Sequence, residues 1–208
     1  YALAVLYYST GGPNWKDNIK LLSESDACTW NDGLVRDDEN DPDYVVGMYC
    51  HTSLNLQLHQ GGLNGTIPWE LSLLSDLVFL RIDQNSLKGT IPTELGRLSV
   101  LQTINFANNS LTGTLPTELG RLTALEEFSM IGNSLSGPLP TELGAWTRIK
   151  RIFVRDSGLK GTLPTELAIL TGLEQLSIVG NDFAGTLPTG LGQLSRLLSL
   201  EIHGYSLS

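Results

Sequence analysis

The sequence is poor in positive charge and lacks a long apolar run. Lysine and arginine together number 13 against 22 aspartates and glutamates, which gives a formal net charge of −9. A nucleic-acid-binding domain presents a basic stripe to the phosphate backbone, so this charge argues against a nucleic-acid partner. Because no apolar run approaches the ~20 residues that span a membrane, we expect no direct membrane insertion of this segment.

A 24-residue repeat runs through most of the chain. Residues 87–101 (LKGTIPTELGRLSVL) recur at 111–125 (LTGTLPTELGRLTAL) and at 159–173 (LKGTLPTELAILTGL). A period between 20 and 50 residues is typical of solenoids. We predict an N-terminal cap over residues 1–52 and a solenoid of six full repeats plus a truncated seventh over residues 53–208. The step has no insertion or deletion at its glycines and prolines, which are Gly65, Gly89, Gly113, Gly137, Gly161, Gly185, Pro68, Pro92, Pro116, Pro140, Pro164 and Pro188.

Each repeat reads as one strand followed by a sharp turn. In residues 101–124, Ile104 and Phe106 alternate with small or polar residues, which is the period-two pattern of a strand with one buried face. Such a strand buries its apolar side only against neighbouring repeats, which predicts a parallel sheet with a continuous core. An asparagine follows most strands, where its amide can bond turn backbone. These positions are Asn85, Asn109, Asn133 and Asn181, with Ser157 in one copy.

The glycine and proline of the repeat predict its return path. Glycine permits unusual backbone angles and close approach, and proline fixes φ and donates no hydrogen bond. After Pro116, the segment TELGRL places Leu119 and Leu122 at i and i+3, which suits one helical or 3₁₀ turn.

The motif LxGTxPxELGxL resembles the plant-type leucine-rich repeats of receptor-like kinase ectodomains and polygalacturonase-inhibiting proteins, with relatives expected in algae and other stramenopiles. This resemblance implies an α/β repeat fold, a right-handed solenoid with a parallel sheet on its concave side. It also implies a second short sheet near the GTLP segment, 3₁₀ turns on the convex side and an N-terminal helical cap. Family members are mostly binding proteins.

The N-terminal segment is similar to the family's capping domain in its helix, tryptophans and cysteine pair, but Cys28 and Cys50 are farther apart than is usual there. The resemblance implies a Cys28–Cys50 disulfide, and the alternative is two buried thiols. A disulfide implies an oxidising compartment, so we expect an extracellular or cell-surface protein. N-x-S/T sequons at Asn108 and Asn64 are candidate glycosylation sites. Both chain ends read as interrupted, so we expect a longer protein.

No set of residues predicts catalysis. His59 and His203 occupy equivalent strand positions six strands apart, or ~29 Å, and so share no metal. No nucleophile–base–orienter set can be assembled from the exposed positions, and no phosphate-binding glycine loop is present. The acidic residues 37–43 lack the glycine and distal glutamate of an EF-hand. We therefore predict no enzymatic activity, no catalytic residue, no metal and no cofactor.

The outward strand positions vary while the core positions do not, which is where a binding surface would be encoded. An aromatic residue beside arginines is favoured at interface hot spots, and Phe153 lies between Arg151 and Arg155. The alternative is that these side chains only pair across strands. The candidate ligand-binding residues of the concave face are Glu127, Ile131, Arg151, Phe153, Arg155, Val179, Phe79 and Arg81.

These features predict an extracellular module that recognises a protein or peptide ligand through its concave face. One alternative is a structural or adhesive wall or matrix element that self-associates. Another is an inhibitor of a secreted hydrolase. A third is an ice-binding face, since threonines recur in two columns on the outside, although Pro138 interrupts the first column and threonine suits strand positions anyway. The columns are Thr90, Thr114, Thr162 and Thr186, and Thr93, Thr117, Thr141, Thr165 and Thr189.

Overall fold

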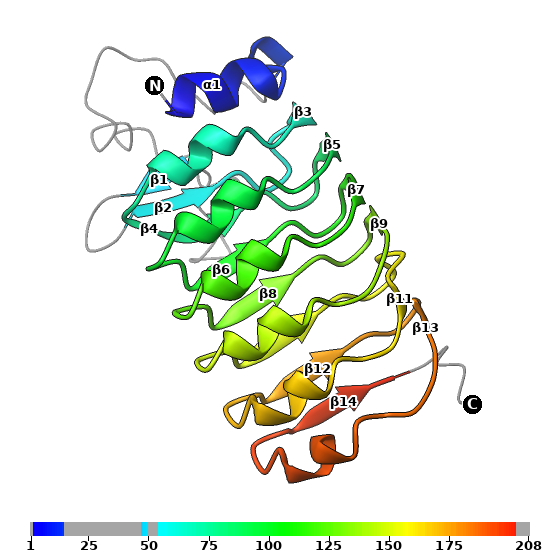
Figure 1. The fold of residues 1–208 in the computed structure, drawn as a ribbon. Helices are drawn as coiled ribbons and strands as arrows, with labels where there is room; N and C mark the ends of the chain where they lie inside the picture. Colours follow the sequence, from blue (N-terminus) through cyan, green and yellow to red (C-terminus); the bar gives the residue numbers. More distant parts are fainter. Residues whose placement is uncertain (1, 15–46, 50–53, 203–208) are drawn as a thin grey trace, which may run out of the picture.

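The computed structural model describes residues 2–14, 47–49 and 54–202, and its repeats stack into a solenoid (Figure 1). An eight-stranded sheet forms one side. Its order is β1 (Gly47–Tyr49), β2 (Leu54–Gln57), β4 (Leu77–Arg81), β6 (Thr103–Asn105), β8 (Glu127–Ser129), β10 (Arg151–Phe153), β12 (Gln175–Ser177) and β14 (Ser199–Glu201). From β2 onward every pairing is parallel, whereas β1 runs antiparallel to β2.

A second series of short parallel strands follows the turns that leave the main sheet. Four of these strands form one sheet in the order β3 (Asn64–Thr66), β5 (Ser86–Gly89), β7 (Ser110–Gly113) and β9 (Ser134–Leu135). The strands β11 (Lys160–Gly161) and β13 (Asp182–Phe183) pair separately. The second sheet that the resemblance implied is therefore present, with a break between β9 and β11.

Six 3₁₀ helices form the side opposite the main sheet, as predicted. They are η2 (Trp69–Leu73), η3 (Thr93–Arg97), η4 (Thr117–Arg121), η5 (Thr141–Ala145), η6 (Thr165–Ile169) and η7 (Thr189–Gln193). The repeated proline precedes each one and is extended before η2 to η6, with φ of −64° at Pro116. Its fixed φ and missing N–H suit this entry, since the first N–H groups of a helix have no partner within it.

At the N-terminal end, helix α1 (Ala2–Ser9) and the short η1 (Gly12–Asn14) lie against the first repeat (Figure 1). The N–H of Asn64 in β3 donates to the carbonyl of Thr10 at 2.8 Å. Leu6 of α1 is fully buried in the common core. The helical part of the predicted cap is thus present, while Cys28 and Cys50 lie outside the described residues.

One apolar core runs through the stack between the main sheet and the 3₁₀ helices. The leucine that ends each outer turn is replaced in one repeat by Trp146, which is fully buried beside Phe128. Its indole N–H donates to the carbonyl of Leu119 at 2.8 Å, which satisfies the polar atom that this larger side chain brings into the core.

The repeated glycine adopts a conformation that other residues rarely take. Gly113 has φ +79°, and a Cβ placed on it would lie 2.8 Å from the Cγ2 of Thr90 in the preceding repeat. Both the left-handed backbone and the close contact between repeats therefore favour glycine, as the sequence predicted.

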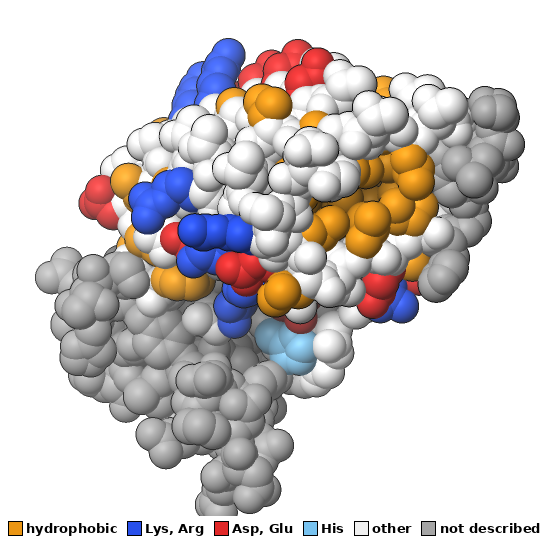
Figure 2. Space-filling view, turned by 90° about the horizontal axis from the view of Figure 1, so that it is seen from below, with side chains coloured by type: hydrophobic (Ala, Val, Ile, Leu, Met, Phe, Trp, Pro, Cys, Tyr) orange, Lys and Arg blue, Asp and Glu red, His pale blue; other side chains and the backbone are white. Residues whose placement is uncertain are grey.

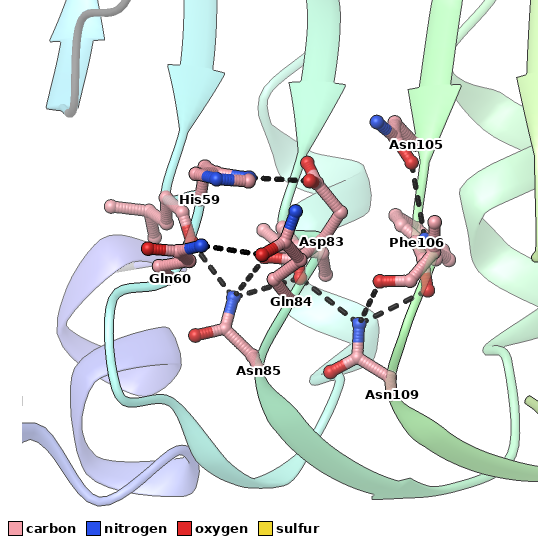
Figure 3. Close-up of polar contacts among 11 residues, drawn as sticks. His59, Gln60, Asp83, Gln84, Asn85, Asn105, Phe106 and Asn109 are labelled. Carbon is pink, nitrogen blue, oxygen red and sulfur yellow. Dashed lines mark hydrogen bonds and ion pairs between the residues drawn. The ribbon is translucent and has the colours of Figure 1, made fainter. Parts of the chain in front are cut away.

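The asparagines form the ladder that the sequence predicted, and Figure 3 shows two of them, Asn85 and Asn109. At Asn133, Nδ2 donates to the carbonyls of Phe106 and Met130 at 3.0 Å, and Oδ1 accepts from the N–H of Leu111 at 3.1 Å. Phe106 and Leu111 belong to the preceding repeat. Each amide therefore closes its own turn and bonds it to the coil before it.

Ser157 keeps part of this connection with a shorter side chain. Its Oγ lies 2.9 Å from the carbonyl of Met130 in the preceding repeat and 2.9 Å from that of Arg155. No amide oxygen is available to the N–H of Leu135, which instead donates to the backbone carbonyl of Ser157 at 2.7 Å. The ladder tolerates serine because the backbone supplies the missing acceptor.

We predict that Asn133→Ala lowers the free energy of unfolding by about 2–4 kcal/mol, because it leaves buried carbonyls and an N–H without partners. Ser134→Ala, at the exposed neighbouring position, is the control and should change stability by about 0.5 kcal/mol or less. Urea unfolding of both variants makes the comparison. Equal stability of the two would contradict a structural role for the amide.

Candidate ligand-binding surface

The outward side of the main sheet, which we call the sheet face, carries all eight predicted binding residues. Alternation along the strands directs Ile152 into the core, at 1% exposure, and leaves Arg151 and Phe153 partly exposed on the other side. Ile131 and Val179, on the chain that leaves β8 and β12, are also only partly buried. The structure thus places these apolar side chains outside the core.

Not every outward position is accessible. The small side chains of Ser129 and Ser177 are only 4% and 3% exposed, and Thr103 and Ala107 are buried as well. Ser129 and Ser177 are the register partners of Phe153 on the two neighbouring strands. On the sheet face, large side chains therefore lie next to small, buried ones on the neighbouring strands. The height of the surface differs from strand to strand as a result.

Four residues on β8, β10 and β12 or just after these strands form what we call the Phe153 patch: Ile131, Phe153, Arg155 and Val179. The parallel ladder continues past the strand ends, since the N–H of Gly132 donates to Arg155 and the N–H of Asp156 donates to Val179. Arg155 therefore lies between Ile131 and Val179 in register, two residues along the chain from Phe153. The patch combines apolar area with one exposed cation.

Arg151 is held by an acidic neighbour. Its Nη2 and Nε donate to the same carboxylate oxygen of Glu127 at 2.7 and 3.1 Å, and the two residues are register partners on β10 and β8. Beside this pair, the Nζ of Lys150 donates to Glu126 at 2.6 Å. On the sheet face, the column of Glu127 and Arg151 is thus neutralised by an ion pair between adjacent strands, and a second ion pair lies just before the same two strands.

The second predicted group, Phe79 and Arg81, has a different geometry. The guanidinium carbon of Arg81 lies 5.9 Å from the centre of the Phe79 ring, which is a cation–π contact. The Nε of Arg81 is buried and has no hydrogen-bond partner. Because Arg81 covers the aromatic ring, Phe79 offers a partner less apolar surface than we expected from the sequence.

The first repeats also carry a polar cluster after β2 and β4, shown in Figure 3. The Nδ1 of His59 lies 2.5 Å from a carboxylate oxygen of Asp83, which is itself 8% exposed. One residue further along the same two turns, the side-chain amide of Gln60 donates to that of Gln84. Both glutamines have positive φ, of 48° and 54°, at a turn position where later repeats use Asn108, Asp156 or glycine.

The two sequons lie at the surface. Asn108 is exposed in the turn after β6 with φ +53°, and Asn64 is exposed in β3 beside the N-terminal helix.

Within the residues that the structure describes, no three histidine, cysteine or acidic side chains are placed to hold a metal ion. No helix in the described part of the chain has the length and apolarity of a membrane span.

Both threonine columns are exposed, and one of them is interrupted. The hydroxyls of Thr93, Thr117, Thr141 and Thr165 each donate to the carboxylate of the following glutamate, which surrounds this column with charge. In the other column Pro138 replaces a threonine, at the break between the second-series strands β9 and β11. One threonine column is therefore continuous but bonded to carboxylates, and the other is broken at Pro138.

The end of the stack at which β14 lies is apolar, and Figure 2 shows orange side chains gathered there. Leu200 of β14 is 44% exposed, whereas its register partner Leu176 in β12 is 1% exposed. Leu198 is 82% exposed. The difference in exposed fraction between Leu200 and Leu176 shows how much of such a side chain a neighbouring coil buries.

Some contacts of the sheet face were not predicted from the sequence. The Oγ of Ser177 donates to Glu201 at 2.7 Å, and the same carboxylate lies 3.6 Å from the guanidinium of Arg155. By contrast, the ion pairs Glu127–Arg151 and Glu126–Lys150 join opposite charges that lie one repeat apart, so the sequence does contain a signal for them. The link from Arg155 to Glu201 spans two strands and has no such signal.

Residues 100–122 match the family model described as Leucine Rich Repeat, and no curated protein matches the sequence. Among solved structures, a TDR receptor is 31% identical over 74% of this chain and 26% of its own, with a TM-score of 0.70. The plant peptide hormone receptor RGFR1, solved in complex with RGF2, is 27% identical over 74% of this chain and 28% of its own, with a TM-score of 0.60.

A plant ice-binding protein has the same fold, with 24% identity, a TM-score of 0.69 and coverage of 99% of this chain and 70% of its own. At that identity the likeness shows the fold alone. The chain spans about a quarter of the length of the two receptors, at 26% and 28%. These findings confirm the predicted similarity to plant leucine-rich-repeat receptors, while relatives in algae stay a prediction.

We predict that Phe153→Ala costs about 1 kcal/mol of unfolding free energy or less, because the ring is partly exposed and its register partners on both neighbouring strands are small serines. Ile152→Ala, one residue earlier in β10, should cost about 2–5 kcal/mol, because Ile152 is 1% exposed in the core. Guanidinium unfolding of both variants gives the two values. Equal losses would mean that Phe153 belongs to the core rather than to a free surface.

Proposed function

We propose that this leucine-rich-repeat solenoid is an extracellular recognition module that binds a protein or peptide through its sheet face, around Arg151, Phe153 and Arg155. The observation that carries the proposal is the Phe153 patch. Its apolar side chains are not needed to fill the core, and they stand beside an exposed arginine on a rigid sheet. That combination is typical of interface hot spots.

The backbone geometry supports recognition by a preformed surface. Strands β8, β10 and β12 are fixed by parallel pairing on both sides and by the core behind them. A side chain on such a sheet loses little further freedom when a partner binds, which lowers the entropic cost of association. Binding on this face would use shape and side-chain complementarity, and it requires no cofactor.

The class of partner is supported by the structural relatives. RGFR1 is named as a plant peptide hormone receptor and was solved in complex with RGF2. Because this chain spans only 28% of that receptor, other parts of a longer protein could contribute to the same partner. Because these structural relatives are receptors, we also propose a location at the cell surface, which is consistent with the two exposed sequons.

Self-association, as in a structural or adhesive element, is the alternative. Such an element should form assemblies at micromolar concentration, whereas a recognition module should sediment as one species. Sedimentation velocity of the wild type separates the two. No observation on the described residues favours a hydrolase inhibitor in particular over other binding proteins.

We predict that Asn108 carries an N-linked glycan when the chain is expressed through a eukaryotic secretory pathway, because its side chain is exposed in a turn. Ser110→Ala removes the sequon and keeps the exposed asparagine, so it should abolish the glycan on the proteolytic fragment that contains Asn108, whatever Asn64 carries, as measured by mass spectrometry with and without a peptide N-glycosidase. An unmodified Asn108 in secreted wild-type protein would contradict the prediction.

We predict that Arg151→Glu/Phe153→Ala weakens binding of peptides selected from a random displayed library by about tenfold or more, since both changes fall in the proposed interface. The matched control is Arg97→Glu/Val100→Ala, which makes the same kinds of change at exposed positions at and after η3. Isothermal titration gives the affinities. Undiminished binding by the sheet-face variant would remove the site from this surface.

A further inference from the structure

The contact between the fourth and fifth repeats, residues 125–148 and 149–172, lacks one of the two sheets that join the other neighbouring pairs of the first six repeats. Strands β9 and β11 do not pair, whereas β3, β5, β7 and β9 form one sheet and β11 pairs with β13. Only the main sheet crosses this contact, through β8 and β10. In a solenoid each repeat contacts only its neighbours, so the stack parts most easily at its weakest contact.

The missing pairing follows from a change in the turn of the fifth repeat. At the preceding contact Thr112 of β7 pairs with Ser134 of β9. One period later, the residue that would pair with Ser136 is Gly158. Gly158 instead has φ +76°, a left-handed conformation that leaves the extended path of a strand. A Cβ placed on it would lie 2.5 Å from the carbonyl oxygen of Leu135, so a larger residue does not fit this turn.

The asparagine ladder is also reduced at this contact. Asn133 and Asn181 join the repeats on either side, and each amide both donates to a carbonyl and accepts from an N–H of the repeat before it. The hydroxyl of Ser157 makes one such bond, to the carbonyl of Met130, and the backbone carbonyl of Ser157 accepts from the N–H of Leu135. Fewer side-chain and strand bonds therefore hold the fifth repeat to the fourth.

Charged side chains cross the same contact. Glu126 and Glu127 of the fourth repeat pair with Lys150 and Arg151 of the fifth, at 2.6 and 2.7 Å. The equivalent residues 102 and 103 of the third repeat are uncharged, so they offer the two glutamates no cation. Salt screens pairs between partly exposed side chains, with a Debye length of ~3 Å at 1 M. The ion pairs therefore make this contact, and not the one before it, sensitive to salt.

We propose that the solenoid opens at the contact between its fourth and fifth repeats, and that salt promotes the opening by screening the ion pairs across it. The repeats before the contact and those after it then form two cooperative units of one stack. Trp146 ties the fourth repeat to the first unit, because its indole N–H bonds the carbonyl of Leu119 in the third repeat. Ile131 and Phe153 lie on opposite sides of the contact, so its opening divides the Phe153 patch.

Native-state hydrogen exchange of the whole chain, followed residue by residue by nuclear magnetic resonance, tests the opening. The N–H of Met130 bonds the carbonyl of Phe153 across the contact, and the N–H of Phe106 makes the equivalent bond to Ser129 one repeat earlier. Both donors belong to fully buried residues. After correction for intrinsic rates, Met130 should exchange about tenfold faster than Phe106. Equal protection of the two N–H groups would overturn the proposal.

A repaired contact distinguishes a weak contact from fraying of the end of the stack. Ser157→Asn/Gly158→Ser gives the fifth repeat the turn residues of the third and fourth repeats. Because the amide and the strand pairing are then restored, exchange at Met130 should slow to within about threefold of Phe106. A difference between the two N–H groups that survives this repair would come from fraying and would contradict the proposal.

The reverse change, one repeat earlier, is the matched control. Asn133→Ser/Ser134→Gly gives the fourth repeat the turn of the fifth, so it should weaken the contact between the third and fourth repeats and speed exchange at Phe106 by about tenfold. This variant keeps the test decisive even if the repaired variant does not fold. Unchanged exchange at Phe106, in a variant with the circular dichroism of the wild type, would also overturn the proposal.

Salt tests the ionic part of the proposal. Raising sodium chloride from about 0.05 M to about 1 M should speed exchange at Met130 about threefold more than at Phe106. Lys150→Gln removes one of the ion pairs and should remove part of that response. A response that is equal at the two N–H groups, or that Lys150→Gln leaves whole, would refute the role of the ion pairs. None of these measurements uses a ligand, so their failure leaves the proposed recognition site in place.

Discussion

The buried amide that joins consecutive coils is the interaction on which the stack depends. An asparagine such as Asn133 bonds carbonyls of its own turn and of the previous one, so neighbouring coils are fixed in register as well as in contact. The apolar core alone would not specify this alignment, because hydrophobic burial has no direction. Directional bonds at one end of most strands and the shared leucines behind the sheet together define the spacing between the strands of the sheet face.

The constraints that neighbouring coils place on each other determine which positions can encode specificity for a partner. Core positions, the turn asparagines and the left-handed glycines are constrained by the neighbouring coil, and the outward strand positions are not. On the outward side, an ion pair with Glu127 on the adjacent strand neutralises Arg151. What is left free is a small apolar group with Arg155 in its midst. The surface offered to a partner is therefore narrower than the sheet itself.

Much of the fold follows from the sequence, because a fixed 24-residue step repeats every constraint in each copy. The strands, the outer 3₁₀ turns and the amide ladder were all predicted from single repeats. The site was only partly predictable, since the outward side chains obey no repeat. The burial of Ser129 and Ser177 beneath their neighbours and the covering of Phe79 by Arg81 depend on side-chain size and conformation. The weak link from Arg155 to Glu201 crosses two strands, and no sequence spacing marks it.

The central claim is that coils bury one another and leave the sheet face free for a partner. Methyl cross-saturation in nuclear magnetic resonance tests it directly, with a selected peptide bound to the perdeuterated, methyl-protonated chain. The account predicts that saturation reaches the methyl groups of Ile131 and Val179 on the sheet face. It also predicts that the exposed methyl groups of Leu73 and Ile169, on the 3₁₀ side, stay unaffected. Saturation of Leu73 and Ile169 with none at Ile131 and Val179 would contradict the account.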